Sequence, residues 1–200
     1  MAKLLIATPA YDPMICAQTY TSALSMDKCG MDIEAYTPNG YTVAQARVKA
    51  AQRALDTHAD WVMFFDSDMV LRNDTLKNLL SHDKDAVFGY CAKTNKDDDT
   101  TSLAKTGRNN YDLFWTKTEL HELAEQGTNL IEIRGGGFGC VLVRTSVFER
   151  IAKPWFHYVY NQDGRKLSED YYFCTQCREA GIKLYADTRT QLGHVRQIVV

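Results

Sequence analysis

The sequence contains no long hydrophobic segment. Its main apolar runs cover residues 4–7 and 61–65, and the second ends abruptly at Asp66. Runs of this length are too short for the core of a signal peptide and far too short to cross a bilayer. We therefore expect no transmembrane segment and predict a cytoplasmic location.

The chain also lacks an excess of charge of either sign. It has 23 Lys and Arg residues against 25 Asp and Glu residues, a formal net charge of −2, with no polybasic arm or acidic tail. Proteins that bind nucleic acids usually present a clustered basic surface, so no nucleic acid partner is expected. A length of 200 residues suits a single domain with a substantial core.

The six cysteines form no recognisable metal or disulfide framework. Cys174 and Cys177 make a C-x-x-C pair, but no second such pair and no matching histidine pair accompanies it. Cys91 and Cys140 lie in apolar, strand-like stretches, where cysteine often acts as a small buried hydrophobic residue. Core thiols are the favoured interpretation, and a redox or zinc role for Cys174 and Cys177 is the alternative.

Strand-like and helix-like segments alternate along the first half of the chain. Helices are predicted from the spacing of apolar residues, and strands from continuous apolar runs. The predicted strands cover residues 3–8, 32–36, 61–65 and 85–90, and the helices cover residues 14–28, 42–57 and 73–81. This alternation indicates an α/β fold, with a central, mostly parallel sheet flanked by helices. The run at residues 61–65 is typical of a central strand buried on both faces.

The second half is more mixed. Residues 94–110 are polar and predict a mobile loop that could close over a ligand. Beyond it, the sequence predicts strands at residues 111–116, 129–134, 140–144 and 183–186, and helices at residues 119–125, after Ser146 and after Ser168. We expect these segments to form a smaller mixed part of the same domain.

The acidic pair Asp66-Ser67-Asp68 follows the buried strand directly. The carboxyl ends of strands are where α/β sheets bind ligands. Two ionised carboxylates so close together repel one another, and a divalent cation with oxygen ligands would relieve that repulsion and could bridge to a diphosphate. A solvated turn in which Asp68 caps the next segment is the simpler structural explanation.

A phosphatase is a second enzymatic interpretation of the same residues. Haloacid dehalogenase-like phosphatases carry D-x-D-x-V/T after an apolar strand, and residues 66–70 fit that pattern. Asp66 would then be the nucleophile and Asp68 the general acid. However, about 65 residues precede the motif, and residues 186–189 lack that family's later acidic cluster.

Together with its surroundings, the acidic pair resembles glycosyltransferases of the GT-A fold related to family 2. The matching segments occur in the family's order and cover nearly the whole chain. They are residues 8–12 (TPAYD), 45–47 (QAR), 65–69 (FDSDM), 89–90 (GY) with Lys93, 136–139 (GGFG), 168–170 (SED) and 193–195 (GHV).

The resemblance implies a single GT-A domain that transfers a sugar from a nucleotide-sugar donor to a hydroxyl of a glycan, a lipid-linked acceptor or a small molecule. Residues 1–93 would form the nucleotide-binding half, and residues 94–200 the acceptor and catalytic half. The residues implied in donor binding are Thr8, Pro9, Ala10, Tyr11, Arg47, Asp66, Ser67 and Lys93, with Arg47 facing the diphosphate.

The resemblance also assigns the chemistry. Asp170 would be the general base for the acceptor hydroxyl in an inverting reaction, with Glu169 positioning the substrate or taking over that role. Gly136, Gly137 and Trp155 would contact the acceptor. Asp66, Asp68 and His194 would bind Mn²⁺ or Mg²⁺, which would neutralise the departing nucleoside diphosphate.

Several of these residues also have an ordinary structural explanation. Carboxylates in a first helical turn, with Ser168 as the N-cap, are stabilising in themselves. In many relatives an asparagine follows the arginine that corresponds to Arg47, but here Val48 does. On the structural explanation, Arg47 is an ordinary solvated residue of a helix. A nucleotide-sugar-binding module without turnover is the third functional class.

Overall fold

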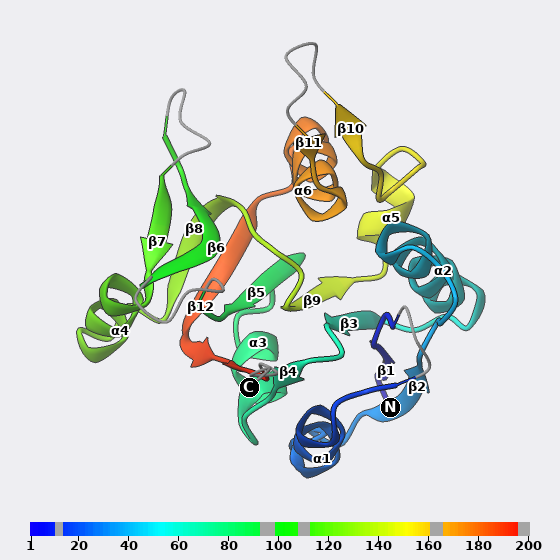
Figure 1. Ribbon diagram of the computed structural model, residues 1–200, viewed down its shortest axis with the longest axis horizontal. Helices are drawn as coiled ribbons and strands as arrows, with labels where there is room; N and C mark the ends of the chain where they lie inside the picture. The colour runs from blue at the N-terminus through cyan, green and yellow to red at the C-terminus, as the bar shows by residue number, and fades with distance from the viewer. Residues whose placement is uncertain (11–13, 93–98, 108–112, 161–165, 196–200) are drawn as a thin grey trace, which may run out of the picture.

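The computed structural model describes residues 1–10, 14–92, 99–107, 113–160 and 166–195. Within them, nine strands form one sheet that runs through the molecule (Figure 1). In spatial order these strands are β2 (Asp32–Tyr36), β1 (Lys3–Ala7), β3 (Trp61–Phe65), β9 (Cys140–Arg144), β5 (Ala86–Tyr90), β12 (Leu184–Gln191), β8 (Leu130–Gly135), β6 (Thr100–Lys105) and β7 (Phe114–Thr116).

The direction of most strands is the same. β1 is parallel to β2 and β3, and β5 is parallel to β12, whereas β9 lies antiparallel between β3 and β5. β8 is antiparallel to both β12 and β6, and β7 is antiparallel to β6. Six of the nine strands therefore run one way, which confirms the predicted α/β class with a mostly parallel sheet.

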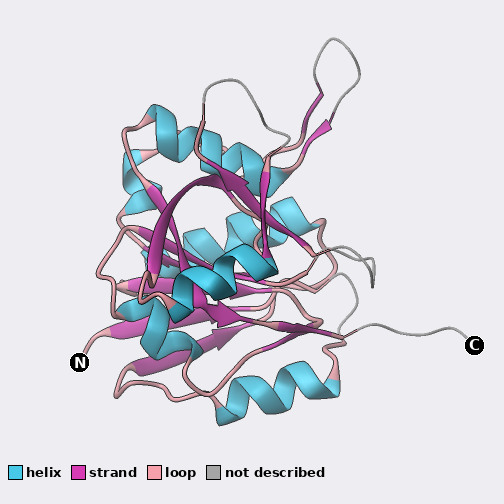
Figure 2. Cartoon of the chain, turned by 90° about the vertical axis from the view of Figure 1, so that its left-hand side faces the viewer, coloured by secondary structure: helices cyan, strands magenta, loops and turns pink. Residues whose placement is uncertain are grey.

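Helices lie on both sides of this sheet (Figure 2). One buried cluster joins the sheet to α2 (Val43–Asp56), α5 (Val147–Arg150) and α6 (Glu169–Glu179). A second cluster includes residues of α3 (Thr75–Leu80) and Met26, which directly follows α1 (Ala17–Ser25). The remaining helix, α4 (Lys117–Glu125), packs against β12 and β7.

The strand before the acidic pair is central, as predicted. All five residues of β3 are buried. Val62 and Phe64 belong to the first cluster, and Trp61, Met63 and Phe65 belong to the second. Because successive side chains point to opposite faces of a sheet, the continuous apolar run fills both layers.

Two predictions about segments were wrong. Residues 100–105 form β6 and are not part of a polar loop; the Thr, Ser and Lys side chains hid a strand whose alternate residues Thr101 and Leu103 are buried. The last long strand covers Leu184–Gln191, twice the predicted length, because its buried residues include Asp187, Thr188 and Thr190. The other parts of the predicted loop, 94–98 and 108–110, lie outside the described residues.

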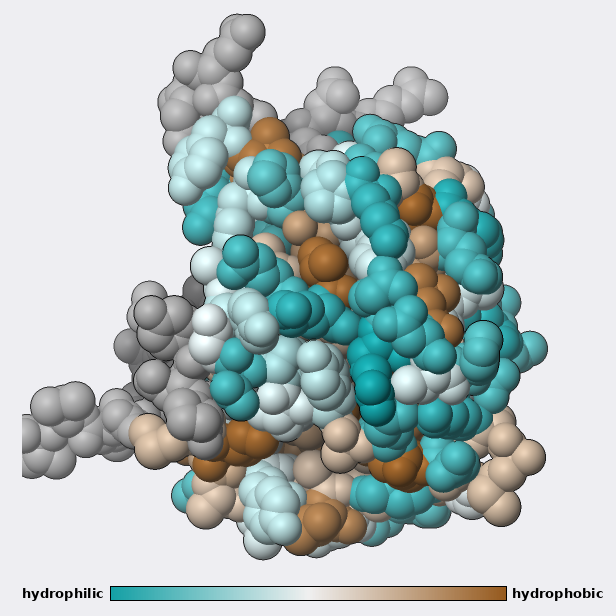
Figure 3. Space-filling model, turned by 90° about the vertical axis from the view of Figure 1, so that its right-hand side faces the viewer, coloured by the Kyte–Doolittle hydropathy of each residue, from teal (hydrophilic) through white to brown (hydrophobic). Residues whose placement is uncertain are grey.

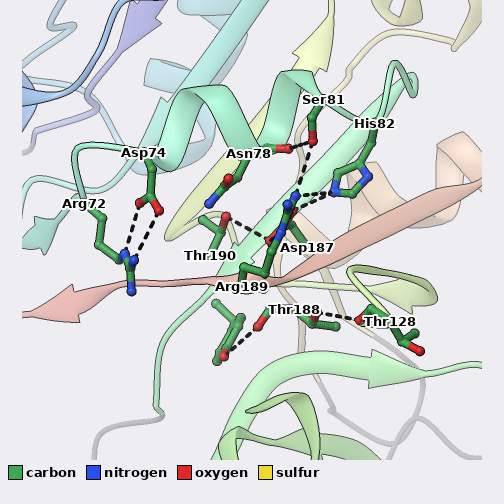
Figure 4. A network of polar contacts seen from close by, with 11 residues as sticks. Arg72, Asp74, Asn78, Ser81, His82, Thr128, Asp187, Thr188, Arg189 and Thr190 are labelled. Atoms are coloured by element: carbon green, nitrogen blue, oxygen red, sulfur yellow. Dashed lines mark hydrogen bonds and ion pairs between the residues drawn. The ribbon is translucent and has the colours of Figure 1, made fainter. Parts of the chain in front are cut away.

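A polar network fixes β12 beside the end of α3 (Figure 4). Asp187 is fully buried, and its carboxylate accepts hydrogen bonds from Arg189 and Thr190 and contacts His82 Nε2 at 2.6 Å. Burial raises the pKa of Asp187, but the hydrogen bonds from Arg189 and His82 outweigh it, so the pKa is lowered overall. β12 is thereby held by an ionised carboxylate inside the core.

We expect Asp187→Asn to lower the free energy of unfolding by about 3 kcal/mol, because breaking a buried ion pair strands its partner. Asp74→Asn is the matched control: Arg72 and Asp74 are also two residues apart, but their side chains are 58% and 43% exposed. Asp74→Asn should lower the free energy of unfolding by less than about 1 kcal/mol. Urea denaturation at pH 7 measures both.

The stability of Asp187→Asn should also depend on pH differently from that of the unsubstituted chain. A carboxyl whose pKa is lowered by folding stabilises the native state above its unfolded pKa of about 3.9 and loses this effect as the pH falls through the native value. The extra stability of the unsubstituted chain over Asp187→Asn should therefore shrink below about pH 4. A difference that stays constant down to pH 2 would contradict an ionised Asp187.

Candidate functional site

The acidic pair lies in a tight turn between β3 and the short strand β4 (Met69–Val70). Backbone hydrogen bonds hold the turn from three sides: Asp66 N donates to Gly139 O at 3.3 Å, Cys16 N donates to Ser67 O at 3.1 Å, and Val195 N donates to Asp68 O at 2.8 Å. The turn is therefore attached to the start of β9, the start of α1 and the end of the described chain.

His194 lies beside Asp68, as predicted. After β12, the strand β13 (Gly193–His194) pairs antiparallel with β4, with His194 opposite Met69. This places His194 Nε2 3.0 Å from Asp68 Oδ2, although the two residues are 126 positions apart. The other ring nitrogen, Nδ1, is buried without a hydrogen-bond partner among the described residues.

Asp66 forms an ion pair with a buried arginine. Arg47 Nη2 lies 2.9 Å from Asp66 Oδ1, while Arg47 Nη1 donates to Glu169 Oε1. Arg47 is only 3% exposed, and its guanidinium lies over the ring of Phe138, 4.9 Å from the centroid. Residues of α2, of the turn after β3 and of α6 are thus joined through one buried side chain, and we call this arrangement the Arg47 bridge.

The local sequence places Arg47 at this point. α2 begins at a capping box in which Thr42 Oγ1 accepts from Gln45 N and Gln45 Oε1 accepts from Thr42 N. This arrangement satisfies two backbone donors that a helix start leaves unpaired. Arg47 lies in the second turn of the helix, with Ala46 and Ala50 buried around it.

The site contains more negative than positive charge. Burial opposes the charge of Arg47, but Asp66, Glu169 and Asp170 outweigh this effect and raise its pKa. Burial also raises the pKa of Asp66, and the nearby charges of Asp68 and Asp170 add to the rise, which Arg47 only partly offsets. Three carboxylates therefore act on Arg47 among the described residues, and a fourth, that of Asp68, lies next to Asp66.

Asp170 is held at the first turn of α6. Ser168 occupies the predicted N-cap position but makes no capping hydrogen bond; its hydroxyl donates to Asp170 Oδ1, which also accepts from Tyr171 N at 2.8 Å. The second oxygen, Oδ2, is 3.6 Å from the point that a Cβ on Gly137 would occupy. The same point is 2.9 Å from Ser102 Oγ, so the absence of a side chain on Gly137 lets Ser102 and Asp170 pack close to the backbone.

The remaining predicted donor residues lie at the end of β1. Thr8 and Ala10 are 4% exposed, and Pro9 is buried as well. Thr8 N donates to Tyr36 O, and Ala10 N donates to Pro38 O. These N–H groups are engaged within the fold and are not available to a nucleotide base. Tyr11 and Lys93 lie outside the described residues.

Two acceptor candidates have packing roles in this structure. Trp155 is 1% exposed and packs against Phe148, so it belongs to the core and not to a ligand surface. A Cβ on Gly136 would lie 2.8 Å from Leu103 and 3.0 Å from Phe88, so this glycine is required for close packing. Gly137, beside Asp170, is the acceptor candidate that faces the site.

The three predicted metal ligands are not assembled into one cluster. Asp68 and His194 face one another, whereas Asp66 is drawn to Arg47. Among the described residues, no group of three or more His, Cys, Asp or Glu side chains is arranged to hold a metal ion. The C-x-x-C pair lies in the core. Cys174 and Cys177 are fully buried, and burial raises the pKa of both thiols, as expected for core cysteines.

Sequence reasoning missed Tyr158. Burial and the charge of Glu169, together with a hydrogen bond to that carboxylate, raise the pKa of Tyr158 to about 12. Tyr158 thus touches the Arg47 bridge through Glu169. It lies in an aromatic stretch between α5 and α6 that has no periodic pattern, so only its aromatic composition could have drawn attention to it.

No protein-family model and no curated protein matches the chain. Solved structures do match. A197 from STIV has a TM-score of 0.60 at 18% identity, covering 98% of this chain and 87% of A197. GalNAc-T7, crystallised with UDP, GalNAc and Mn²⁺, has a TM-score of 0.65 at 10% identity, covering 99% of this chain and 44% of that one. S. aureus TarS 1-349 in complex with UDP-GlcNAc has a TM-score of 0.54 at 12% identity, covering 99% of this chain and 60% of that one.

Similarity at these identities is similarity of fold. The chain has the GT-A fold, which confirms the resemblance at that level, and it spans less than two thirds of GalNAc-T7 and of the TarS fragment. In the described residues, no helix is long and apolar enough to cross a membrane.

Removing the Arg47 bridge should destabilise the fold. Arg47→Met leaves two carboxylates uncompensated and should cost about 3–5 kcal/mol in the free energy of unfolding. The control Arg53→Met, on the same helix, removes an ion pair with Glu34 whose arginine is 51% exposed and should cost less than about 1 kcal/mol. Chemical denaturation measures both variants.

A second substitution tests the cause. Glu169→Gln in the Arg47→Met background removes one of the stranded charges and should recover part of the lost stability. If Arg47→Met were as stable as Arg53→Met, the guanidinium would have no structural role in the ligand-free protein.

Proposed function

We propose that this chain is a metal-dependent glycosyltransferase that moves a sugar from a nucleotide-sugar donor to a hydroxyl acceptor with inversion. The observation that carries the proposal is the Arg47 bridge, which holds the Asp66–Asp68 turn and the Glu169–Asp170 turn in one site. The GT-A fold shared with GalNAc-T7 and TarS, whose structures contain UDP or UDP-GlcNAc, supports it.

The donor side of the site is the edge formed by β1 and β3. Ser67 would face the nucleotide, and the buried residues Thr8, Pro9 and Ala10 would support the site from the end of β1. Tyr11 and Lys93 remain candidates from the sequence alone. Residues 1–93 would supply this half, and residues 94–200 the acceptor and catalytic half.

The residues present fit a divalent cation. Asp68 Oδ2 and His194 Nε2 face one another at 3.0 Å, a carboxylate and an imidazole that suit Mn²⁺ or Mg²⁺ together with diphosphate oxygens. When bound, the cation would neutralise the charge that develops on the departing nucleoside diphosphate. Asp66 would add negative charge to the site while its ion pair with Arg47 fixes its position.

Asp170 would act as the general base. Ser168 and Tyr171 N hold its Oδ1, which leaves Oδ2, beside Gly137, to accept the proton of the acceptor hydroxyl. The hydroxyl oxygen would form a bond to the anomeric carbon as the bond to the diphosphate breaks on the opposite side, which inverts the configuration. Glu169, buried against Arg47, would position α6.

The phosphatase alternative is not favoured. Its nucleophile would be Asp66, but one oxygen of that carboxylate is paired with the buried guanidinium of Arg47. The GT-A fold also differs from the one that alternative requires. A binding module without turnover differs from the proposed enzyme in one measurable respect, the transfer or hydrolysis of the donor sugar.

Asp68→Asn should abolish the Mn²⁺-dependent binding of nucleoside diphosphates. A ligand at 100 times its Kd stabilises a protein by about 2.7 kcal/mol, a rise of several degrees in Tm. A thermal-shift panel of UDP, GDP, CDP and dTDP, with and without Mn²⁺, measures this rise. Asp74→Asn is the control and should keep the full effect; an equal rise in Asp68→Asn would exclude Asp68 as a ligand.

Asp170→Asn separates catalysis from structure. The amide keeps the size of the side chain and its hydrogen bond from Tyr171 N, but it cannot take a proton. Sugar transfer should fall by about 10²–10⁴-fold, while donor affinity and Tm change little. The measurement is product formation with a nucleotide-sugar panel, and nuclear magnetic resonance of the product reports its anomeric configuration. Near-normal transfer would remove Asp170 from the mechanism.

A further inference from the structure

A groove runs beside the site between α2 and the segment that precedes the hairpin of β10 (Val159–Tyr160) and β11 (Lys166–Leu167). Its volume is about 550 Å³, within the range of small-molecule sites, and its lining includes Tyr41, Thr42, Gln45, Lys49, Phe156 and Tyr158. Figure 3 shows this side of the molecule, where hydrophilic surface predominates and apolar surface is confined to separate patches. The lining itself is mostly aromatic and aliphatic, with polar groups from Thr42, Gln45 and Lys49, so the groove suits a ligand that combines a carbon skeleton with polar groups.

The groove adjoins the candidate site at one residue of its lining. Tyr158 lines the groove and also forms a hydrogen bond to Glu169, the neighbour of Asp170. A ligand lying in the groove would thus reach toward the first turn of α6, where the proposed base is located.

One lysine lines the groove and a second lies beside it. Lys49, in the lining, has its Nζ 4.5 Å from the centroid of the Tyr41 ring, and Lys166 Nζ is 3.9 Å from that of Tyr158, which also lines the groove. Both lysines are exposed, and among the described residues no carboxylate forms an ion pair with either of them.

A second groove on the protein also contains cationic side chains, but these are paired with other protein groups. The groove of about 440 Å³ lined by Arg178, Lys183 and Glu132 also contains cations. There, Lys183 Nζ lies 2.8 Å from Glu132 Oε2, and Arg178 donates to Arg134 O and to Thr175 Oγ1. Those charges already have protein partners, whereas the described neighbours of Lys49 and Lys166 are the aromatic rings of Tyr41 and Tyr158.

We propose that the groove between α2 and residues 154–158 binds the acceptor, and that this acceptor is a sugar or polyol carrying a phosphate group. The inference rests on the proposed glycosyltransferase function. The ammonium groups of Lys49 and Lys166 would contact the phosphate, Thr42 and Gln45 offer hydrogen-bonding groups to hydroxyls, and the aromatic walls contact the carbon skeleton. The hydroxyl to be glycosylated would extend past Tyr158 toward Asp170.

Direct binding to the full ¹⁵N-labelled chain tests this assignment, with glucose 6-phosphate as the probe and glucose as its neutral match. Glucose 6-phosphate should shift the amide resonances of residues 41–49 and 156–158 and bind at least about tenfold more tightly than glucose. Lys49→Gln should weaken its binding about fivefold, and Lys49→Gln/Lys166→Gln by more than tenfold, as expected for one and two exposed charge contacts.

Lys84→Gln is the matched control, because Lys84 also lies over a tyrosine, 5.5 Å from the ring of Tyr185, but away from the groove. It should bind glucose 6-phosphate as the unsubstituted chain does. Equal affinity for the two sugars, an equal loss in Lys84→Gln, or displacement of glucose 6-phosphate by UDP with Mn²⁺ would each overturn the groove assignment. Failure of nucleotide sugars to bind or react would instead overturn the proposed function, because the titration itself contains no donor.

Discussion

The buried guanidinium of Arg47 is the constraint on which the site depends. Removing an arginine from water is costly, and the cost is offset here by two carboxylates and the face of Phe138. One carboxylate directly follows β3 and the other is in α6. Because both pair with Arg47, this side chain fixes how the turn after β3 and the start of α6 are placed relative to each other. The position of Asp170 follows from that of its neighbour Glu169, and the position of Asp68 from that of Asp66.

The same bridge leaves the site short of positive charge. Arg47 faces three carboxylates, and Asp68 adds a fourth next to Asp66. Burial is the largest cause of the raised pKa of Asp66, and the charges of Asp68 and Asp170 add to it. Folding tolerates this because Asp68 and Asp170 are only partly buried and remain hydrated. A divalent cation would relieve the repulsion that remains among these carboxylates, and this is the physical reason to propose a metal at this edge of the sheet.

Sequence patterns predicted the parts of the fold that depend on local composition. The apolar run of β3, the acidic turn after it and the alanine-rich face of α2 all have short-range signatures. The partner of Arg47 could not be predicted, because Glu169 is 122 residues away and charge alone does not identify a buried pair. Trp155 was misjudged for a related reason: an aromatic residue in an irregular segment fits a ligand surface as well as a core. β6 was missed because its polar residues obscured its alternation.

The second half of β12 contains buried polar residues, which made the strand hard to predict and which also support the path of the chain toward the site. Asp187, Thr188 and Thr190 made its second half look like a solvated segment, yet all three are buried, because His82, Arg189, Thr128 and Tyr90 complete their hydrogen bonds. A buried polar residue costs little once its partners are in place. The strand can therefore continue to Gln191, opposite Tyr90, and the chain leaves the sheet beside β4. The network around Asp187 thus supports the strand that leads to β13, and the pairing of β13 with β4 places the imidazole of His194 3.0 Å from Asp68.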